Sequence, residues 1–112
     1  MEIQCNKLMD NAVFIETTGR MDASMAPNFE AQCRKWIEKG ATFIVADMEN
    51  LEYLSSAGLR SILVISKLLK QAGGKLLFCG VKGSVKEIFE ISGFASIFDF
   101  YDKPEQALAE IK

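Results

Sequence analysis

The chain has no histidine, and this absence removes several kinds of chemistry at once. Histidine is the commonest general base, a frequent metal ligand and the centre of the serine–histidine–aspartate triad. Three cysteines are present, but Cys5, Cys33 and Cys79 are far apart and form no CxxC pair. Free, buried thiols in a reducing cytoplasm are therefore expected, rather than a disulfide framework or a zinc site. The sequence predicts neither an enzyme nor a bound cofactor or metal.

The chain also lacks a cluster of basic residues and a long apolar run. Its 13 Lys and Arg are set against 15 Asp and Glu, which gives a formal net charge of −2. A nucleic-acid partner usually requires a clustered basic face, so none is expected. The longest apolar stretches, such as residues 62–65, are too short to span a bilayer, and no signal-peptide pattern opens the chain. These features predict a cytoplasmic protein without membrane insertion.

What is present suits a single globular domain over residues 1–112, since 49% of the residues are apolar and 25% are charged. Apolar runs and turn residues predict five strands, over residues 1–8, 12–18, 42–48, 75–79 and 97–101. Asp10 and Asn11 supply the turn between the first two.

Helical spacing predicts four helices between and after these strands. The first is capped by Asp22 or Ser24 and ends at Gly40, and the others cover residues 57–72, 84–92 and 104–111. The resulting order is β-β-α-β-α-β-α-β-α. Strands alternating with helices imply parallel pairing with right-handed crossovers, and the opening hairpin adds an antiparallel edge. The fold class is therefore α/β with a mixed, mostly parallel sheet.

The stretch LEYLSSAGLRSIL, residues 51–63, places two serines where a buried strand hands over to a helix. Ser56 is a good helix cap at this point, and a phosphate on it would be stabilised by the helix dipole. The two roles are compatible, and both stay open. A nucleophile elbow needs G-x-S-x-G with a histidine, and a P-loop needs G-x-x-x-x-G-K-[ST]; neither motif occurs.

The helix after these serines is apolar over a wide arc. Ile65 and Leu68 lie off the face that Leu59, Ile62 and Leu69 share, so they could form a protein-binding patch or be buried by a neighbouring helix. Asp22 and Asp47 are single carboxylates at strand ends. Capping and turn formation are their ordinary roles, and a metal or an oriented hydroxyl would require that they meet.

Four segments together resemble the STAS domain family (sulphate transporter and anti-sigma factor antagonist), and the likeness covers essentially the whole chain. The segments are GRMDASMAPNF, FIVADMENLEYLSSAGLRSIL, GGKLLFCGV and VKEIFEISGFASIFDFY. The resemblance implies the STAS fold. In bacterial anti-sigma factor antagonists of this family the turn usually reads D-S-[ST]-G-L. A partner that is both anti-sigma factor and ATP-dependent serine kinase phosphorylates the first of the two hydroxyl residues.

Aligned on Gly58-Leu59, the phosphorylatable serine falls on Ser56, and Ser55 takes the place of the family aspartate. Ser55 is thus a second, weaker candidate for phosphorylation. Ala57 replaces the second hydroxyl, and the aspartate of the family's G-x-[LM]-D stretch falls on Asp22. The expected partner-binding residues are Asp22, Ser55, Ser56, Ala57, Gly58, Leu59, Ile65 and Leu68.

The resemblance implies a regulatory binding protein, an anti-sigma factor antagonist. Its unphosphorylated form would bind the anti-sigma factor/serine kinase and free the sigma factor, and a serine phosphatase would reset the cycle. The alternative is a STAS accessory subunit of a lipid-transport ABC complex or of a sensory assembly, in which the turn docks without being phosphorylated. The oligomeric state stays open.

Overall fold

Five strands form one sheet in a computed structural model that describes residues 2–111, so Met1 lies outside the described part. They are β1 (Glu2–Met9), β2 (Ala12–Met21), β3 (Phe43–Leu54), β4 (Lys75–Cys79) and β5 (Asp99–Tyr101), and they lie side by side in chain order. β1 pairs antiparallel with β2, and the other neighbours pair in parallel. The predicted mixed sheet with an antiparallel edge is confirmed.

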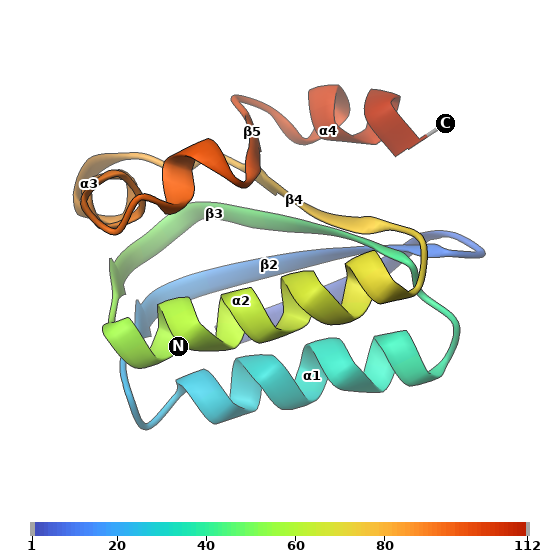
Figure 1. Ribbon diagram of the computed structural model, residues 1–112, viewed down its shortest axis with the longest axis horizontal. Coiled ribbons are helices and arrows are strands. Elements are labelled where there is room, and N and C mark those ends of the chain that lie inside the picture. Colours follow the sequence, from blue (N-terminus) through green and yellow to red (C-terminus); the bar gives the residue numbers. More distant parts are fainter. Residues whose placement is uncertain (1, 112) are drawn as a thin grey trace.

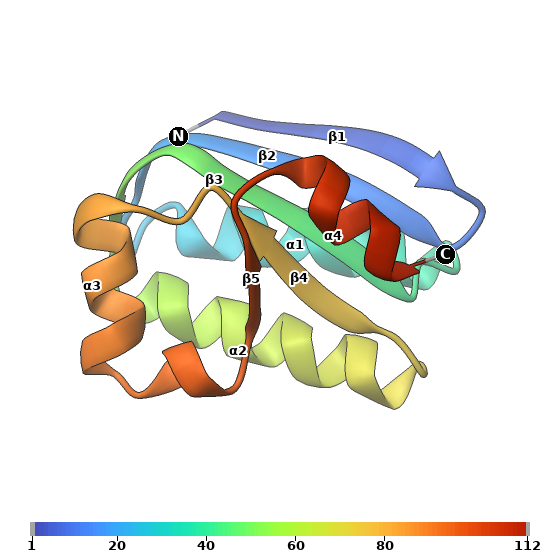
Figure 2. The same cartoon turned by 90° about the horizontal axis from the view of Figure 1, so that it is seen from above.

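Four α-helices cover the two faces of the sheet unequally. They are α1 (Ala26–Glu38), α2 (Ser56–Gln71), α3 (Gly83–Ile91) and α4 (Pro104–Ile111). α1 and α2 pack against each other below the sheet, whereas α4 lies on the opposite face (Figures 1 and 2). Within residues 2–111, no helix combines the length and the hydropathy needed to cross a bilayer. The predicted element order is confirmed.

β2 and β3 are longer than the sequence pattern predicts. β2 continues past Thr18 to Met21, and β3 continues past Met48 to Leu54. Two shifts in the register between these strands interrupt the alternation of buried and exposed residues, so the apolar pattern breaks while the pairing continues. The extension brings the ends of β2 and β3 together, where the backbone N–H of Ser55 donates to the carbonyl of Met21 at 2.9 Å.

A short 3-10 helix, η1 (Phe94–Ser96), precedes β5 and was not predicted. Gly93 enters it with a φ of +82°, a left-handed conformation that glycine adopts without strain. The 3-10 helix and its C-cap extend to Ile97, so the last strand begins at Asp99 instead of residue 97. Phe94 and Phe98 lie in contact across this turn, with ring centroids 5.9 Å apart.

The main core lies between the sheet and α1, α2 and α3. An aromatic cluster within it joins α3 to β4 and β5, because the Phe89 ring lies 5.3 Å from that of Phe78 and 5.2 Å from that of Phe100. Such pairs add roughly 0.5–1.5 kcal/mol each beyond the burial of their area. The cluster therefore fixes α3 and η1 beside the N-terminal half of α2.

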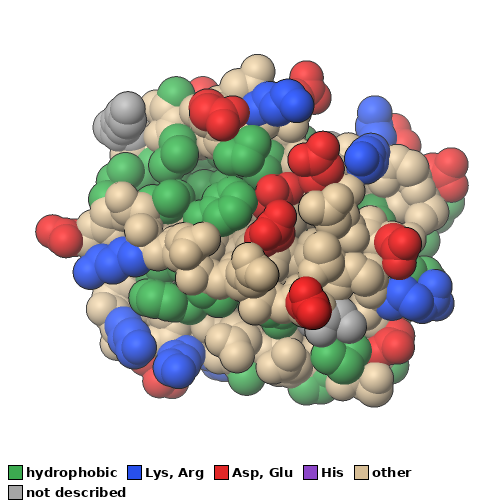
Figure 3. Space-filling model, turned by 180° about the vertical axis from the view of Figure 1, so that it is seen from behind, with side chains coloured by type: hydrophobic (Ala, Val, Ile, Leu, Met, Phe, Trp, Pro, Cys, Tyr) green, Lys and Arg blue, Asp and Glu red, His purple; other side chains and the backbone are tan. Residues whose placement is uncertain are grey.

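A smaller core lies under α4 on the other face of the sheet. It consists of Val45, Leu77, Cys79 and Ala107, with half-buried Leu8, Phe14, Phe43, Tyr101 and Ile111 around it. Figure 3 shows apolar side chains gathered on the back of the molecule, with acidic side chains along their border. α4 packs on β3, β4 and β5, so one eight-residue helix covers only part of this face.

The predicted partner-binding role of Ile65 is wrong. Ile65 is 0% exposed and belongs to the main core, because the buried stripe of α2 runs through Gly58, Ile62, Ile65 and Leu69. This spacing of four, three and four residues is that of one helix face. Leu68 is half-buried and packs against the same core. The exposed apolar patch expected at Ile65 and Leu68 does not form.

Gly58, which the sequence predicts to contact a partner, is also buried. Its lack of a side chain is explained by packing inside the domain. A Cβ at this position would lie 2.7 Å from Leu54 Cδ1 and 3.0 Å from Met21 Sδ. Both neighbours are fully buried at the ends of β3 and β2. The missing side chain thus allows the first turn of α2 to rest directly on the two strand ends.

Substituting Gly58→Val should lower the free energy of unfolding by roughly 2 kcal/mol, because the added methyl groups overpack a closed site. Lys67→Val on the exposed side of α2 should cost at most about 0.5 kcal/mol, since only helix propensity changes. Urea unfolding monitored by far-ultraviolet circular dichroism measures both. Equal costs for the two variants would contradict the packing role of Gly58.

Candidate functional site

The two adjacent serines have different structural roles. Ser55 is the N-cap of α2: its Oγ accepts a hydrogen bond from the backbone N–H of Gly58 at 3.0 Å, and its carbonyl accepts one from Leu59. The predicted cap at Ser56 is therefore wrong by one residue. Ser56 is the first residue of the helix and is exposed. Within residues 2–111 its hydroxyl has no hydrogen-bond partner, so it is available for chemistry.

Asp22 organises the neighbouring turn between β2 and α1. Its Oδ1 accepts hydrogen bonds from the Ser24 hydroxyl at 2.7 Å, from the Met25 N–H at 3.0 Å and from the Ser24 N–H at 3.1 Å. The Ser24 hydroxyl is the main reason why the pKa of Asp22 lies below its ordinary value. Asp22 is thus a carboxylate at neutral pH, and it shapes the turn that precedes α1. The predicted capping of α1 by Asp22 or Ser24 is wrong, because the N-cap residue is Met25 and no side-chain hydrogen bond caps the helix.

Asp47 serves a separate turn. It is buried, and its Oδ1 accepts a hydrogen bond from the Glu49 N–H at 3.0 Å. Its carboxylate faces Cys79, whose pKa is raised to about 12, chiefly by burial. Burial likewise raises the pKa of Cys33, and all three cysteines are free. In the described part of the chain, no group of three or more His, Cys, Asp or Glu side chains is placed to hold a metal.

A groove beside Ser56 separates α2 from the segment that follows α3. Ser56, Leu59, Arg60 and Leu63 form its α2 wall, and Ser92 and Phe94 form the other; this α2–η1 groove measures about 250 Å³. Ile91 and Ile97 flank the second wall in the chain and are 82% and 58% exposed. Apolar side chains with such exposure next to a groove are typical of a protein-binding surface.

A second groove runs along the other side of α2, between α1 and α2. Its volume is about 400 Å³. Arg60 lines this α1–α2 groove as well as the α2–η1 groove, so its side chain stands between the two. The remaining lining residues of the α1–α2 groove are Ala23, Ala26, Pro27, Glu30, Ala31, Arg34, Ala57, Ser61 and Val64.

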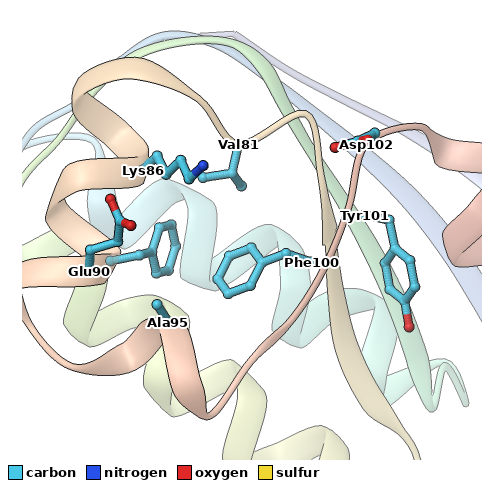
Figure 4. A pocket seen from close by; sticks show the side chains of 8 residues that line it. Val81, Lys86, Glu90, Ala95, Phe100, Tyr101 and Asp102 are labelled. Atoms are coloured by element: carbon cyan, nitrogen blue, oxygen red, sulfur yellow. The ribbon is translucent and has the colours of Figure 1, made fainter.

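A third hollow, of about 200 Å³, lies between α3 and β5 (Figure 4). Val81, Ala95 and the Phe100 ring form apolar walls, and Lys86 and Glu90 project from α3 at its edge. The ring of Tyr101 points away from the hollow, and burial raises the pKa of its phenol. The phenol therefore stays protonated and supplies no base to this hollow.

The structure brings most of the predicted partner-binding residues to one end of the molecule. Asp22 follows β2, and Ser55, Ser56, Ala57 and Leu59 follow β3, at the end where α3 also lies (Figure 1). Leu59 is only 7% exposed but lines the α2–η1 groove.

Sequence reasoning missed Arg60, Leu63 and Phe94 as lining residues of the α2–η1 groove. The spacing of Ser56 and Arg60 was a usable signal, because residues four apart share a helix face. Phe94 offered none, because it comes from a segment whose fold was not predicted.

The different structural roles of Ser55 and Ser56 can be tested by measuring the stability of variants at each position. Ser55→Ala should cost about 1 kcal/mol, because it removes the cap of α2. Ser56→Ala should change the stability by less than about 0.5 kcal/mol, as is usual for an exposed side chain without contacts. Thermal and urea unfolding of both variants give the comparison. A larger loss for Ser56→Ala than for Ser55→Ala would refute the assignment.

Known proteins resemble this chain over its whole length. The model of the STAS domain family matches residues 6–107. BtrV of Bordetella bronchiseptica, which carries the name of an anti-sigma factor antagonist, is 38% identical over 112 residues, covering 100% of this chain and 96% of that protein.

Solved structures share the fold. The anti-sigma factor antagonist SpoIIAA in its unphosphorylated form superposes with a TM-score of 0.87 and 20% identity, over 98% of this chain and 96% of that one. The phosphorylated form of Bacillus SpoIIAA gives a TM-score of 0.79 with 18% identity, over 99% of this chain and 100% of that one. These two structures show that the fold is shared, and the family match over residues 6–107 together with the 38% identity to BtrV establishes that the chain is a member of the STAS domain family.

Proposed function

We propose that this chain is an anti-sigma factor antagonist that binds an anti-sigma factor with serine kinase activity and is switched by phosphorylation of Ser56. The observation that carries the proposal is the free, exposed hydroxyl of Ser56 at the start of α2, beside a Ser55 that the cap already engages. The names of its relatives support the regulatory class. Such a protein would act in the cytoplasm, where sigma factors act.

In this proposal the chain is the substrate of the kinase and not itself a catalyst. Ser56 Oγ attacks the γ-phosphorus of ATP held by the partner, and the new O–P bond forms while the bond to the ADP oxygen breaks. In this step the hydroxyl proton passes to a base of the partner kinase. A serine phosphatase later hydrolyses the phosphoserine with water and releases inorganic phosphate.

The unmodified surface suits a partner that buries apolar area. Leu59, Leu63 and Phe94 line the α2–η1 groove, and Ile91 and Ile97 stand exposed beside it. Burial of such side chains is the main favourable contribution to protein association. Ser56 lines the same groove, so a partner seated there would also contact the hydroxyl that it modifies.

Phosphorylation would weaken this association by charge. A phosphate adds about −1.5 to −2 charges at neutral pH, and burying it in an interface costs desolvation free energy. The ionised Asp22 precedes α1 at the same end of the sheet, and Glu49 and Glu52 are exposed on the last part of β3. These acids would add repulsion without a change of fold.

A second candidate function remains, because the family aspartate is replaced by Ser55. A carboxylate that could orient the Ser56 hydroxyl or help to hold a metal near ATP is absent from that position. This replacement favours an accessory subunit of a lipid-transport ABC complex or a sensory assembly, in which the turn docks and is never modified. A pull-down that retrieves an ABC ATPase instead of a serine kinase would select it.

The proposal predicts which variants accept phosphate. The recombinant anti-sigma factor/serine kinase encoded nearest this gene, supplied with ATP, should phosphorylate the native chain and Ser55→Ala but not Ser56→Ala. Intact-mass spectrometry detects the added phosphoryl group. Equal modification of the native chain and Ser56→Ala would place the switch elsewhere.

Binding gives an independent measure of the switch. Ser56→Asp should bind the same kinase at least about tenfold more weakly than Ser56→Ala, because a rim charge facing acids opposes association. Isothermal titration calorimetry without ATP isolates the binding step. Equal affinities, together with no phosphate transferred to the native chain, would overturn the proposal.

A further inference from the structure

We infer that Arg60 holds the phosphate of phosphorylated Ser56, and that this ion pair lays the phosphate over the α2–η1 groove. The inference rests on the proposed function, since it takes Ser56 as the modified residue. It adds a regulatory step within the chain itself: the modification closes the docking groove through a residue of the same helix.

The geometry of α2 places the two residues together. Ser56 and Arg60 are four residues apart, and both line the α2–η1 groove. Side chains at this spacing are neighbours on a helix surface, about 5–6 Å apart at Cβ. A helical side chain leans toward the N-terminus and covers the preceding turn, so the Arg60 guanidinium reaches back toward Ser56.

Within residues 2–111, Arg60 forms no ion pair with an acidic side chain. The two ion pairs of this part of the chain join Arg34 to Glu30 and Lys75 to Asp99. Arg20 instead lies over the ring of Tyr53. The planar guanidinium of Arg60 therefore keeps its donors for a phosphate, whose oxygens it can contact in pairs.

The charged groups around Ser56 determine the side on which a phosphate settles. Asp22 lies at the β2–α1 turn, next to Ala23, which lines the α1–α2 groove. On α1, Glu30 and Arg34 face the same groove and are paired with each other. The opposite wall of the α2–η1 groove contributes only the uncharged Ser92 and Phe94. Arg60 lines both grooves, so its attraction does not choose between them; Ser56 itself lines the α2–η1 groove, and repulsion from Asp22 on the other side favours that groove. Glu52, whose carbonyl accepts a hydrogen bond from Ser84 of α3, is the acid on the α3 side, and the pairing of the phosphate with Arg60 offsets its repulsion.

A phosphate held there changes the docking groove in two ways. It places a hydrated dianion next to the apolar side chains of Leu59 and Leu63, which a partner would have to desolvate. It also converts the rim charge from about +1 at Arg60 to about −1 for the ion pair. An apolar partner segment that carries an acidic residue would lose both its site and its counter-charge.

The test uses the intact chain with phosphoserine incorporated at position 56 during translation. Phosphorus NMR follows the second ionisation of the phosphate in the native sequence, Arg60→Gln, Arg60→Lys and Lys67→Gln. A nearby cation favours the dianion, so the phosphate pKa should be about 0.3 higher in Arg60→Gln than in the native chain. Arg60→Lys should restore most of the difference.

Lys67→Gln is the matched control, because it removes the same charge from α2. Position 67 is about 16 Å along the helix from Ser56, where an exposed charge is largely screened at ordinary salt. Its phosphate pKa should equal that of the native chain. Equal values in Arg60→Gln and Lys67→Gln would overturn the inference.

Methyl NMR tests the position of the phosphate. The Leu63 methyl signals should move when native Ser56 carries phosphate and should move less in Arg60→Gln, whereas Leu8 on the other face of the sheet should not respond. Unmoved Leu63 signals in the phosphorylated native chain would also overturn the inference. No kinase takes part, so these outcomes are independent of whether a kinase phosphorylates Ser56, which the phosphorylation assay decides separately.

Discussion

The hydrogen bond from the Gly58 N–H to Ser55 Oγ is the contact on which the site depends. It starts α2 at Ser56, and the bond from the Ser55 N–H to the Met21 carbonyl ties that start to the end of β2. Gly58, without a side chain, lets the first turn rest on Leu54 and Met21. Ser56 is consequently held on a rigid support while its own hydroxyl remains free.

Much of this architecture follows from the sequence. The short apolar runs at β3 and β4, the turn at Asp10-Asn11 and the helix ends at glycines predict the element order and the mixed sheet. The STAS resemblance places Ser56 correctly at the start of α2. These features depend on local pattern and turn chemistry, which a single sequence displays directly.

The errors arise where tertiary contacts decide the outcome. Ile65 was predicted to lie outside the buried face of α2. The positions of the apolar residues along the sequence do not determine which of them face the core; packing of α2 against the sheet and the neighbouring helices does. The cap was assigned to Ser56 because adjacent serines have the same propensity, and only the pairing of Ser55 with Met21 distinguishes them. The α2–η1 groove joins residues that are 29 to 38 positions apart in the chain, and its second wall depends on the unpredicted η1 turn.

The physical basis proposed for the switch is that neighbouring residues have different roles. Ser55 and Gly58 maintain the start of α2, whereas in the proposed switch Ser56 would accept the modification and the apolar side chains of the groove would bind the partner. Because the phosphate would be added outside the core, it can change binding without unfolding the domain. The most direct measurement is tandem mass spectrometry of the protein isolated from its own cells, with the phosphate localised between the two serines. Phosphate on Ser56, with Ser55 unmodified, is the predicted result; phosphate on Ser55, or a chain that is never phosphorylated, would contradict it.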